Sequence, residues 1–408
     1  MESKYKRLKL ACYSINVTMS TVGNMTPLLF LTFRSLYGIS YSLLGLLVLI
    51  NFSTQLIIDL VFSFYSHKFN IPLVVKAMPL IAIIGFIIYS LSPDIFPNNV
   101  YIGLAVGTVI FSVASGLAEV LISPIIAQIP SENPEREMSK LHSVYAWGVV
   151  GIVLFATLFL LLFGYENWQI LSLVFAVIPL VSFILFMGAE IPNMKTQDRV
   201  SSAVDFIKNK GVWLCVFAIF LGGASECTMA QWISGYLEMA LGIPKIWGDV
   251  FGVALFAVTL GIGRSLYAKS GSNITKVLYL GAVGATVCYL IAAVTPFALL
   301  GLIASGLTGF CVSMLWPGSL VVASDRFPNG GVLIFALMAA GGDMGASVGP
   351  QLVGIVTDSV MNNPLFSSIA GYFGITMEQL GMKAGMLIGM LFPMLAIFIF
   401  SRIIKTEK

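Results

Sequence analysis

Twelve stretches of about 20 or more mostly apolar residues dominate the sequence, and each is long enough to cross a lipid bilayer. An apolar core about 30 Å thick needs about 20 residues at a helical rise of 1.5 Å per residue. The connections between most stretches are short, so no separate soluble domain fits between them. We therefore predict an all-α integral membrane protein with twelve transmembrane helices, over residues 10–33, 41–66, 73–91, 99–128, 140–163, 168–188, 211–240, 249–268, 275–293, 297–324, 332–360 and 381–402.

The composition excludes a water-soluble enzyme. Only 10% of the residues are charged and the mean hydropathy is +0.95, whereas a soluble domain carries about 25% charged residues. The sequence has no phosphate-binding GxxxxGK[ST] motif, and its 2 histidines and 5 dispersed cysteines form no metal-binding or catalytic pattern. We expect no enzymatic activity, no metal and no cofactor.

The basic residues predict how the chain is oriented. If the N-terminus is cytoplasmic, all of the 22 Lys and Arg except Arg34, Lys245 and Lys383 fall on the cytoplasmic side, and positively charged loops stay inside. We therefore expect a multi-pass protein of the cell membrane with both termini in the cytoplasm. The net charge of +3 reflects this topology and does not indicate a nucleic-acid partner.

The chain repeats itself at an offset of about 200 residues. The stretch SGLAEVLISP (115–124) in the fourth span has a counterpart, SGLTGFCVSMLWPG (305–318), in the tenth. This repeat predicts an N-terminal six-helix bundle over 1–190, a cytoplasmic inter-bundle loop over 191–210 and a C-terminal six-helix bundle over 211–408. Such duplicated transporters bind their substrate near the midplane of the membrane, between the two bundles.

Four acidic residues lie in mid-span, away from the ends of the predicted helices, where a carboxylate must face water, pair with a base or be protonated. Glu119 has no basic residue near it in sequence and is a candidate for proton or substrate binding. Glu226 is a second candidate, accompanied by Gln231 and Trp232. For Asp59 we favour a gating ion pair, and the same interpretation applies to Arg264 in the related eighth span. For Asp343 helix packing and gating are equally open.

Aromatic and amide side chains inside the spans favour a sugar. Trp147, Trp232 and Trp316 lie within spans, where a flat indole face suits the C–H face of a sugar and nearby polar groups suit its hydroxyls. Packing within the bundles is an equally good explanation for any one of these tryptophans. In the polar first span, Asn16 and Asn24 share one helix face with Ser20, and we expect this face to line the cavity.

Three of these stretches resemble a known family. GLAEVLISP (116–124), LHSVYAWGVVG (141–151) and GASECTMAQWISGYL (223–237) resemble the fucose permease group of sugar–proton symporters, within the major facilitator superfamily. The resemblance implies the major facilitator fold, a coupling or sugar-binding role for Glu119, and sugar contacts for His142 and Tyr145. The first span has no acidic residue, unlike fucose permease, so uniport or coupling through Glu119 or Glu226 alone stays open.

The sequence therefore predicts a monomeric secondary transporter that moves a small hydrophilic solute, with a monosaccharide favoured, by alternating access and proton symport. The alternatives are a sugar uniporter and an exporter of drug-like or lipid-like amphiphiles. The partners we expect are the solute, protons and the lipid bilayer. The predicted proton-coupling residues are Glu119 and Glu226; the substrate-binding residues are Asn16, Asn24, Glu119, His142, Tyr145, Glu226, Gln231, Trp232 and Trp316; and the gating residues are Asp59, Arg264 and Asp343.

Overall fold

A computed structural model describes residues 2–65, 68–130, 134–192, 208–270, 273–327 and 331–406. These residues form helices and short connections, with no strand among them, which confirms the all-α prediction. The chain divides into two compact units. Unit 1 consists of Met1–Thr32 and Ile50–Arg199, and unit 2 of Phe33–Leu49 and Val200–Lys408.

Unit 1 is built from long helices and a few short ones. Its elements are α1 (Glu2–Leu28), the later part of α3 (Tyr41–Tyr65), α4 (Ile71–Ser90), α5 (Ser92–Ile95), α6 (Val100–Gln128), α7 (Pro134–Phe163), the 3₁₀ turn η2 (Tyr165–Asn167), α8 (Trp168–Phe175) and α9 (Val177–Met187). The predicted inter-bundle loop covers residues 191–210. Residues 193–207 of this loop lie outside the described residues.

Unit 2 begins within α2 (Phe30–Tyr37) and includes the start of α3. Its other elements are α11 (Lys210–Leu241), α12 (Lys245–Trp247), the π-helix η3 (Gly248–Val253), α13 (Ala254–Ser270), α14 (Ile274–Val294), α15 (Ala298–Val312), α16 (Leu315–Arg326), α17 (Gly331–Met361), the 3₁₀ turn η5 (Pro364–Phe366), α18 (Ser367–Phe373) and α19 (Met377–Thr406).

The twelve predicted spans coincide with helices of the structure. Ten segments of the described residues are long and apolar enough to cross a membrane. Helices α1 and α17, of 27 and 31 residues, occupy the first and eleventh predicted spans. α1 is the less apolar of the two, because it begins with Lys and Arg and continues with Asn, Ser and Thr. The chain is therefore a multi-pass membrane protein.

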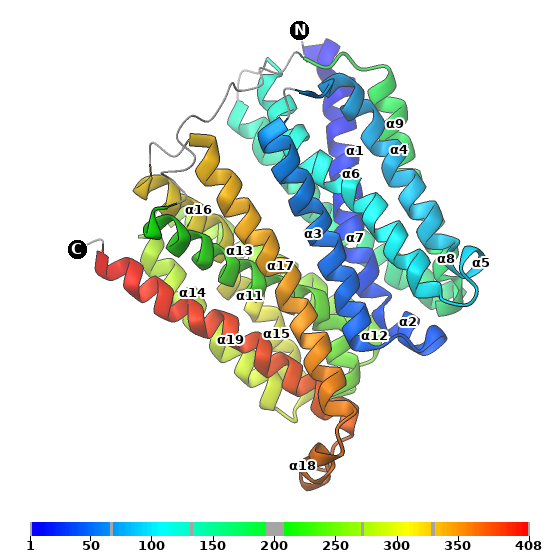
Figure 1. The fold of residues 1–408 in the computed structure, drawn as a ribbon, viewed down its shortest axis with the longest axis vertical. Coiled ribbons are helices and arrows are strands. Elements are labelled where there is room, and N and C mark those ends of the chain that lie inside the picture. Colours follow the sequence, from blue (N-terminus) through cyan, green and yellow to red (C-terminus); the bar gives the residue numbers. More distant parts are fainter. Residues whose placement is uncertain are drawn as a thin grey trace. The chain divides into compact units, whose positions relative to one another are not determined.

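The two units repeat one packing scheme. In unit 1, α1 packs against α7 and α9, and α4 packs against α6. In unit 2, α11 packs against α17 and α19, and α14 packs against α15. Within each unit the long helices run beside one another (Figure 1).

A row of glycines on α17 allows it to approach α11 closely. A Cβ added at Gly345 would overlap the backbone carbonyl oxygen of Phe220 on α11, and a Cβ added at Gly349 would overlap the hydroxyl of Thr228 and lie 3.0 Å from the Ala224 carbonyl oxygen on the same helix. Small residues of this kind let membrane helices pack backbone to backbone, where dispersion rather than the hydrophobic effect holds them together. The row therefore fixes the α11–α17 contact that positions the site described next.

Candidate substrate and coupling site

Unit 2 brings together two residues that the sequence singled out separately. Arg264 on α13 lies with its Nη2 3.4 Å from Oε1 of Glu226 on α11. Glu226 sits about 24 Å of helix from the start of α11, well inside the span. Its other oxygen, Oε2, is buried and has no hydrogen-bond partner among the described residues. The carboxylate can therefore accept one more hydrogen bond or a proton.

The Arg264 guanidinium also donates a hydrogen bond to a backbone carbonyl that is freed where a proline interrupts a helix. Pro317 has no N–H to donate to the carbonyl of Ser313 four residues earlier, and α15 ends at Val312 while α16 begins at Leu315. Arg264 Nε donates to this released Ser313 carbonyl at 3.1 Å. The break thus creates an acceptor inside the membrane, and the acceptor orients the arginine towards Glu226.

Trp316, next to this break, forms a flat surface against two glycines. A Cβ at Gly342 of α17 would lie 2.5 Å from Cζ2 of the indole, and a Cβ at Gly223 of α11 would lie 3.0 Å from Cζ3. The ring therefore rests on bare backbone and is only partly buried. Its position depends on both glycines lacking a side chain.

The other predicted residues of unit 2 lie in its packed interior. Trp232 is 1% exposed and donates its indole N–H to the carbonyl of Pro350 at 2.9 Å, and its ring packs against that of Tyr41. Gln231 and Asp343 are also buried. A substrate contact with Trp232 would require α11 and α17 to separate at this point, and its assignment stays a prediction.

In unit 1, Glu119 lies on α6 about 14 Å of helix from the Gln128 end. Its side chain is exposed, although the residues around it, Gly116 to Ala118 and Leu121, are buried. No described side chain forms an ion pair with it. A carboxylate at this depth faces water or the interior of the protein rather than lipid.

The polar residues of α1 contact α7. Asn16 is buried and donates to the Leu141 carbonyl at 2.6 Å, and Ser20 donates to the Tyr145 carbonyl at 2.9 Å. Asn24 donates to the Ser20 carbonyl of its own helix. The Tyr145 side chain is exposed, and the side chain of His142 lies outside the described residues.

A polar ladder between α3 and α6 was missed by the sequence analysis. Ser112 donates to Asn51 Oδ1 at 2.6 Å, and Ser115 donates to Gln55 Oε1 at 2.9 Å. The sequence does contain a pattern that predicts this contact, because the amides of Asn51 and Gln55 are four residues apart and share one face of an otherwise apolar span. Asp59 continues the same face of α3 and is buried.

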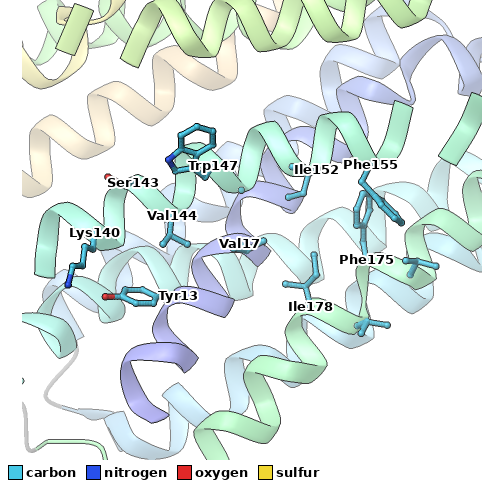
Figure 2. Close-up of a pocket in the computed structure, with 14 residues that line it drawn as sticks. Tyr13, Val17, Lys140, Ser143, Val144, Trp147, Ile152, Phe155, Phe175 and Ile178 are labelled. Carbon is cyan, nitrogen blue, oxygen red and sulfur yellow. The ribbon is translucent and has the colours of Figure 1, made fainter. Parts of the chain in front are cut away.

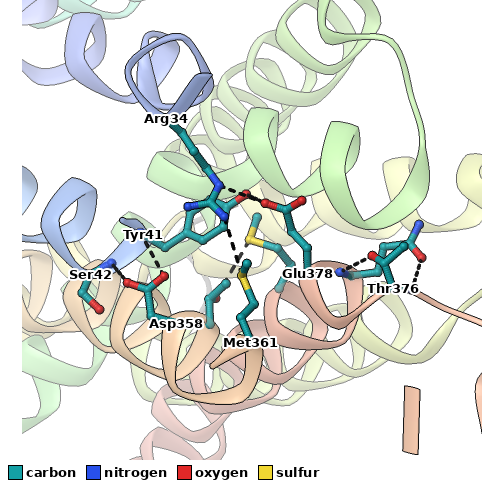
Figure 3. A network of polar contacts seen from close by, with 10 residues as sticks. Arg34, Tyr41, Ser42, Asp358, Met361, Thr376 and Glu378 are labelled. Carbon is teal, nitrogen blue, oxygen red and sulfur yellow. Dashed lines mark hydrogen bonds and ion pairs between the residues drawn. The ribbon is translucent and has the colours of Figure 1, made fainter. Parts of the chain in front are cut away.

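A second missed cluster joins α2 and the start of α3 to α17 and α19 within unit 2 (Figure 3). Arg34 Nε donates to Glu378 Oε1 at 2.9 Å, and the Arg34 guanidinium lies 4.1 Å from the centre of the Tyr41 ring. Asp358 accepts the backbone N–H groups of Tyr41 and Ser42 at 3.1 and 2.6 Å. Its hydrogen bonds join residues 316 or more positions apart in sequence, so spacing could not have revealed it.

Each unit carries polar groups inside the membrane. Unit 1 offers an exposed carboxylate in mid-span, and unit 2 offers a carboxylate paired with a guanidinium next to an indole face. The described residues hold no cluster of three His, Cys, Asp or Glu side chains that could bind a metal ion.

The fold and these intramembrane sites define a membrane transporter. The family model of the Major Facilitator Superfamily matches residues 11–350, and the chain therefore belongs to this superfamily. No curated protein matches the chain in sequence.

Solved structures share the fold at low sequence identity. A D-xylose–proton symporter is 14% identical over 96% of this chain and 97% of its own, with a TM-score of 0.73. The E. coli fucose–proton symporter is 16% identical over 98% of each chain, with a TM-score of 0.61. A bacterial homologue of the human lysosomal transporter Spinster is 14% identical over 98% of this chain and 97% of its own, with a TM-score of 0.69.

Proposed function

We propose that the protein is a secondary transporter of the cell membrane that moves a small hydrophilic solute, with a monosaccharide as the favoured class, together with a proton. The observation that carries this proposal is the exposed Glu119 carboxylate in the middle of an apolar helix. Such a group needs a hydrated path, and a hydrated path at mid-membrane serves a polar solute.

The site in unit 2 supports the choice of solute. The Trp316 face can stack on the C–H face of a sugar ring, while Glu226 and Arg264 offer an acceptor and donors to its hydroxyls. Structural neighbours include symporters of D-xylose and fucose, and these relatives support a sugar by analogy of fold only.

In the proposed mechanism, a proton from outside neutralises Glu119 once solute has bound. The loss of charge removes the cost of enclosing the carboxylate when the hydrated space closes. Opening to the cytoplasm rehydrates Glu119, which then releases its proton, and the solute leaves with it. The excess of Lys and Arg in alternate loops supports an orientation with both termini in the cytoplasm.

The test is transport by protein reconstituted into vesicles, after a thermal-stabilisation screen of sugars, nucleosides, amino acids and hydrophobic drugs has identified a solute. Glu119→Gln should abolish accumulation driven by a pH gradient and preserve counterflow of the solute. Glu166→Gln, at an exposed carboxylate in η2, is the matched control and should behave as the parent protein.

Each result decides between the candidate functions. Accumulation by Glu119→Gln at the parental rate would exclude the coupling role of Glu119. If the rate of solute transport by the parent protein does not depend on the pH gradient, the protein is a uniporter. Stabilisation by hydrophobic drugs alone would identify an exporter of amphiphiles.

A further inference from the structure

An apolar groove in unit 1 shares no lining residue with the carboxylate sites described above. It has a volume of about 940 Å³ and is lined by α1, α7, α8 and α9 (Figure 2). Its lining includes Val17, Ile152, Phe155 and Ile178. The volume is within the range of sites that enclose whole small molecules, about 300–1,000 Å³.

The groove opens towards the surroundings of the protein. Trp147 and Phe155 line it and are 75% and 44% exposed. Along α7 the exposed apolar face continues through Leu158 and Leu162. In a membrane protein, exposed apolar side chains in a span contact lipid tails. The groove is therefore accessible from the bilayer.

The groove is longer than the apolar depth of one leaflet. Its lining extends along α7 from Lys140 to Phe155, which is about 22 Å of helix. One leaflet supplies about half of an apolar core about 30 Å thick. A groove of this length can hold an acyl chain along its whole depth, with one end at the headgroup level.

That end is positively charged. Lys9 and Lys140 lie 2.9 and 2.7 Å from the two oxygens of Glu137, so two cations face one carboxylate. Hydrogen bonds from Lys140 and Lys9 lower the pKa of Glu137 to about 2, and the carboxylate is ionised at neutral pH. Among these three side chains one positive charge is left unbalanced, and the Lys140 side chain, which lines the groove, is 47% exposed.

We propose that the groove binds an anionic phospholipid from the leaflet at the Lys140 end, with one acyl chain along α7 and the headgroup at Lys140 and Tyr13. Basic pockets between membrane helices recognise anionic headgroups in this way. The excess of Lys and Arg on the cytoplasmic side makes this the cytoplasmic leaflet. The bound lipid is a resident of the protein and distinct from the transported solute.

Quenching of tryptophan fluorescence by brominated acyl chains tests the proposal, because Trp147 lines the groove. The protein is reconstituted in phosphatidylcholine with a small fraction of brominated phosphatidylglycerol or brominated phosphatidylcholine. The difference from Trp147→Phe isolates the contribution of Trp147. We expect about fivefold preferential quenching by the anionic lipid, the ratio that corresponds to about 1 kcal/mol for one lysine near the surface.

Two variants separate charge from space. Lys140→Gln should reduce the quenching by the anionic lipid to that of phosphatidylcholine, while Lys9 keeps its pair with Glu137. Gly151→Leu should reduce quenching by both lipids, because a Cβ at Gly151 meets nothing within 4 Å and a leucine fills the groove without conflict. Lys269→Gln and Gly261→Leu are the matched controls, since Lys269 is exposed and Gly261 is equally open.

Equal quenching by the two brominated lipids in the parent protein would overturn the proposal. The same holds for an anionic preference that survives Lys140→Gln. Loss of quenching in Gly151→Leu without any anionic preference would identify an unselective hydrocarbon groove, which also contradicts the proposed headgroup recognition.

Discussion

Arg264 bridges Glu226 and the carbonyl of Ser313, so that one guanidinium links three membrane helices or helix ends of unit 2. The arginine reaches these partners because Pro317 ends the regular hydrogen bonding at Ser313. A charge pair of this kind in a membrane can form and break with the binding of a proton or a solute. The pair is the natural first target for mutagenesis.

Breaking the pair from either side should reduce transport more than stability. Arg264→Gln leaves Glu226 without its cation, and we expect counterflow to fall at least tenfold. Arg264→Lys keeps the charge but cannot reach both acceptors, and an intermediate rate is expected. In a double-mutant cycle with Glu226→Gln, the thermal unfolding data should give a coupling energy of about 0.5–1 kcal/mol, because the arginine is 45% exposed. Strictly additive effects would mean that the two groups act independently.

A side chain at Gly342 should displace Trp316. Gly342→Leu forces the indole off its support, and overpacking of this kind costs about 1–3 kcal/mol. Melting in detergent should therefore occur at a lower temperature than in the parent protein. Gly261→Leu, in open space, should melt normally. If Trp316 is the obstacle, Gly342→Leu combined with Trp316→Ala should recover part of the loss; no recovery would place the conflict elsewhere.

Asp358 should stabilise the start of α3. Its carboxylate accepts two backbone N–H groups, those of Tyr41 and Ser42, in the first turn, where a helix has no acceptor of its own. Asp358→Ala should lower the free energy of unfolding by about 1–2 kcal/mol, the usual cost of losing an N-terminal cap. Hydrogen exchange should then accelerate at the first turn of α3. Unchanged protection there would show that water replaces the carboxylate at no cost. Glu166→Ala, at an exposed acid, is the control.

The Lys9–Glu137–Lys140 contact should be insensitive to pH near neutrality. The pKa of Glu137 is lowered to about 2 by its two lysines, below its ordinary value of 4.5. Its contribution to stability is therefore complete above about pH 4.5 and is lost as the pH falls through about 2. The difference in melting temperature between the parent protein and Glu137→Gln should stay constant from about pH 8 to pH 5 and shrink in more acidic buffer. A difference that already changes between pH 7 and pH 6 would assign the effect to another group.

The helices were predictable from the sequence because their signal is local. A stretch of about 20 apolar residues must cross the membrane whatever its neighbours are, and this reasoning placed all twelve spans. The break at Ser313 was equally accessible, since Pro317 cannot donate to the residue four positions earlier.

Contacts between helices were less predictable, because they depend on which face each helix turns to its neighbour. Glu226 and Arg264 were both selected from the sequence, but their pairing joins residues 38 positions apart on separate helices. Trp232 and Trp316 looked equivalent as tryptophans inside spans, yet one is enclosed between α11 and α17 and the other is only partly buried. The Arg34–Glu378 pair spans 344 positions, and only the folded chain brings its two ends together.

The contrast between the glycines at 342 and 151 bears on how this protein can vary over evolutionary time. At Gly342, Gly345 and Gly349 the neighbouring helix or ring occupies the place of a side chain, and at Gly151 and Gly261 nothing does. Substitutions at Gly342, Gly345 and Gly349 should be removed by selection. Substitutions at Gly151 and Gly261 should accumulate, because they have little effect on folding. The residues of the groove lined by Gly151 can therefore change in the course of evolution, while the close contact between α11 and α17 is conserved.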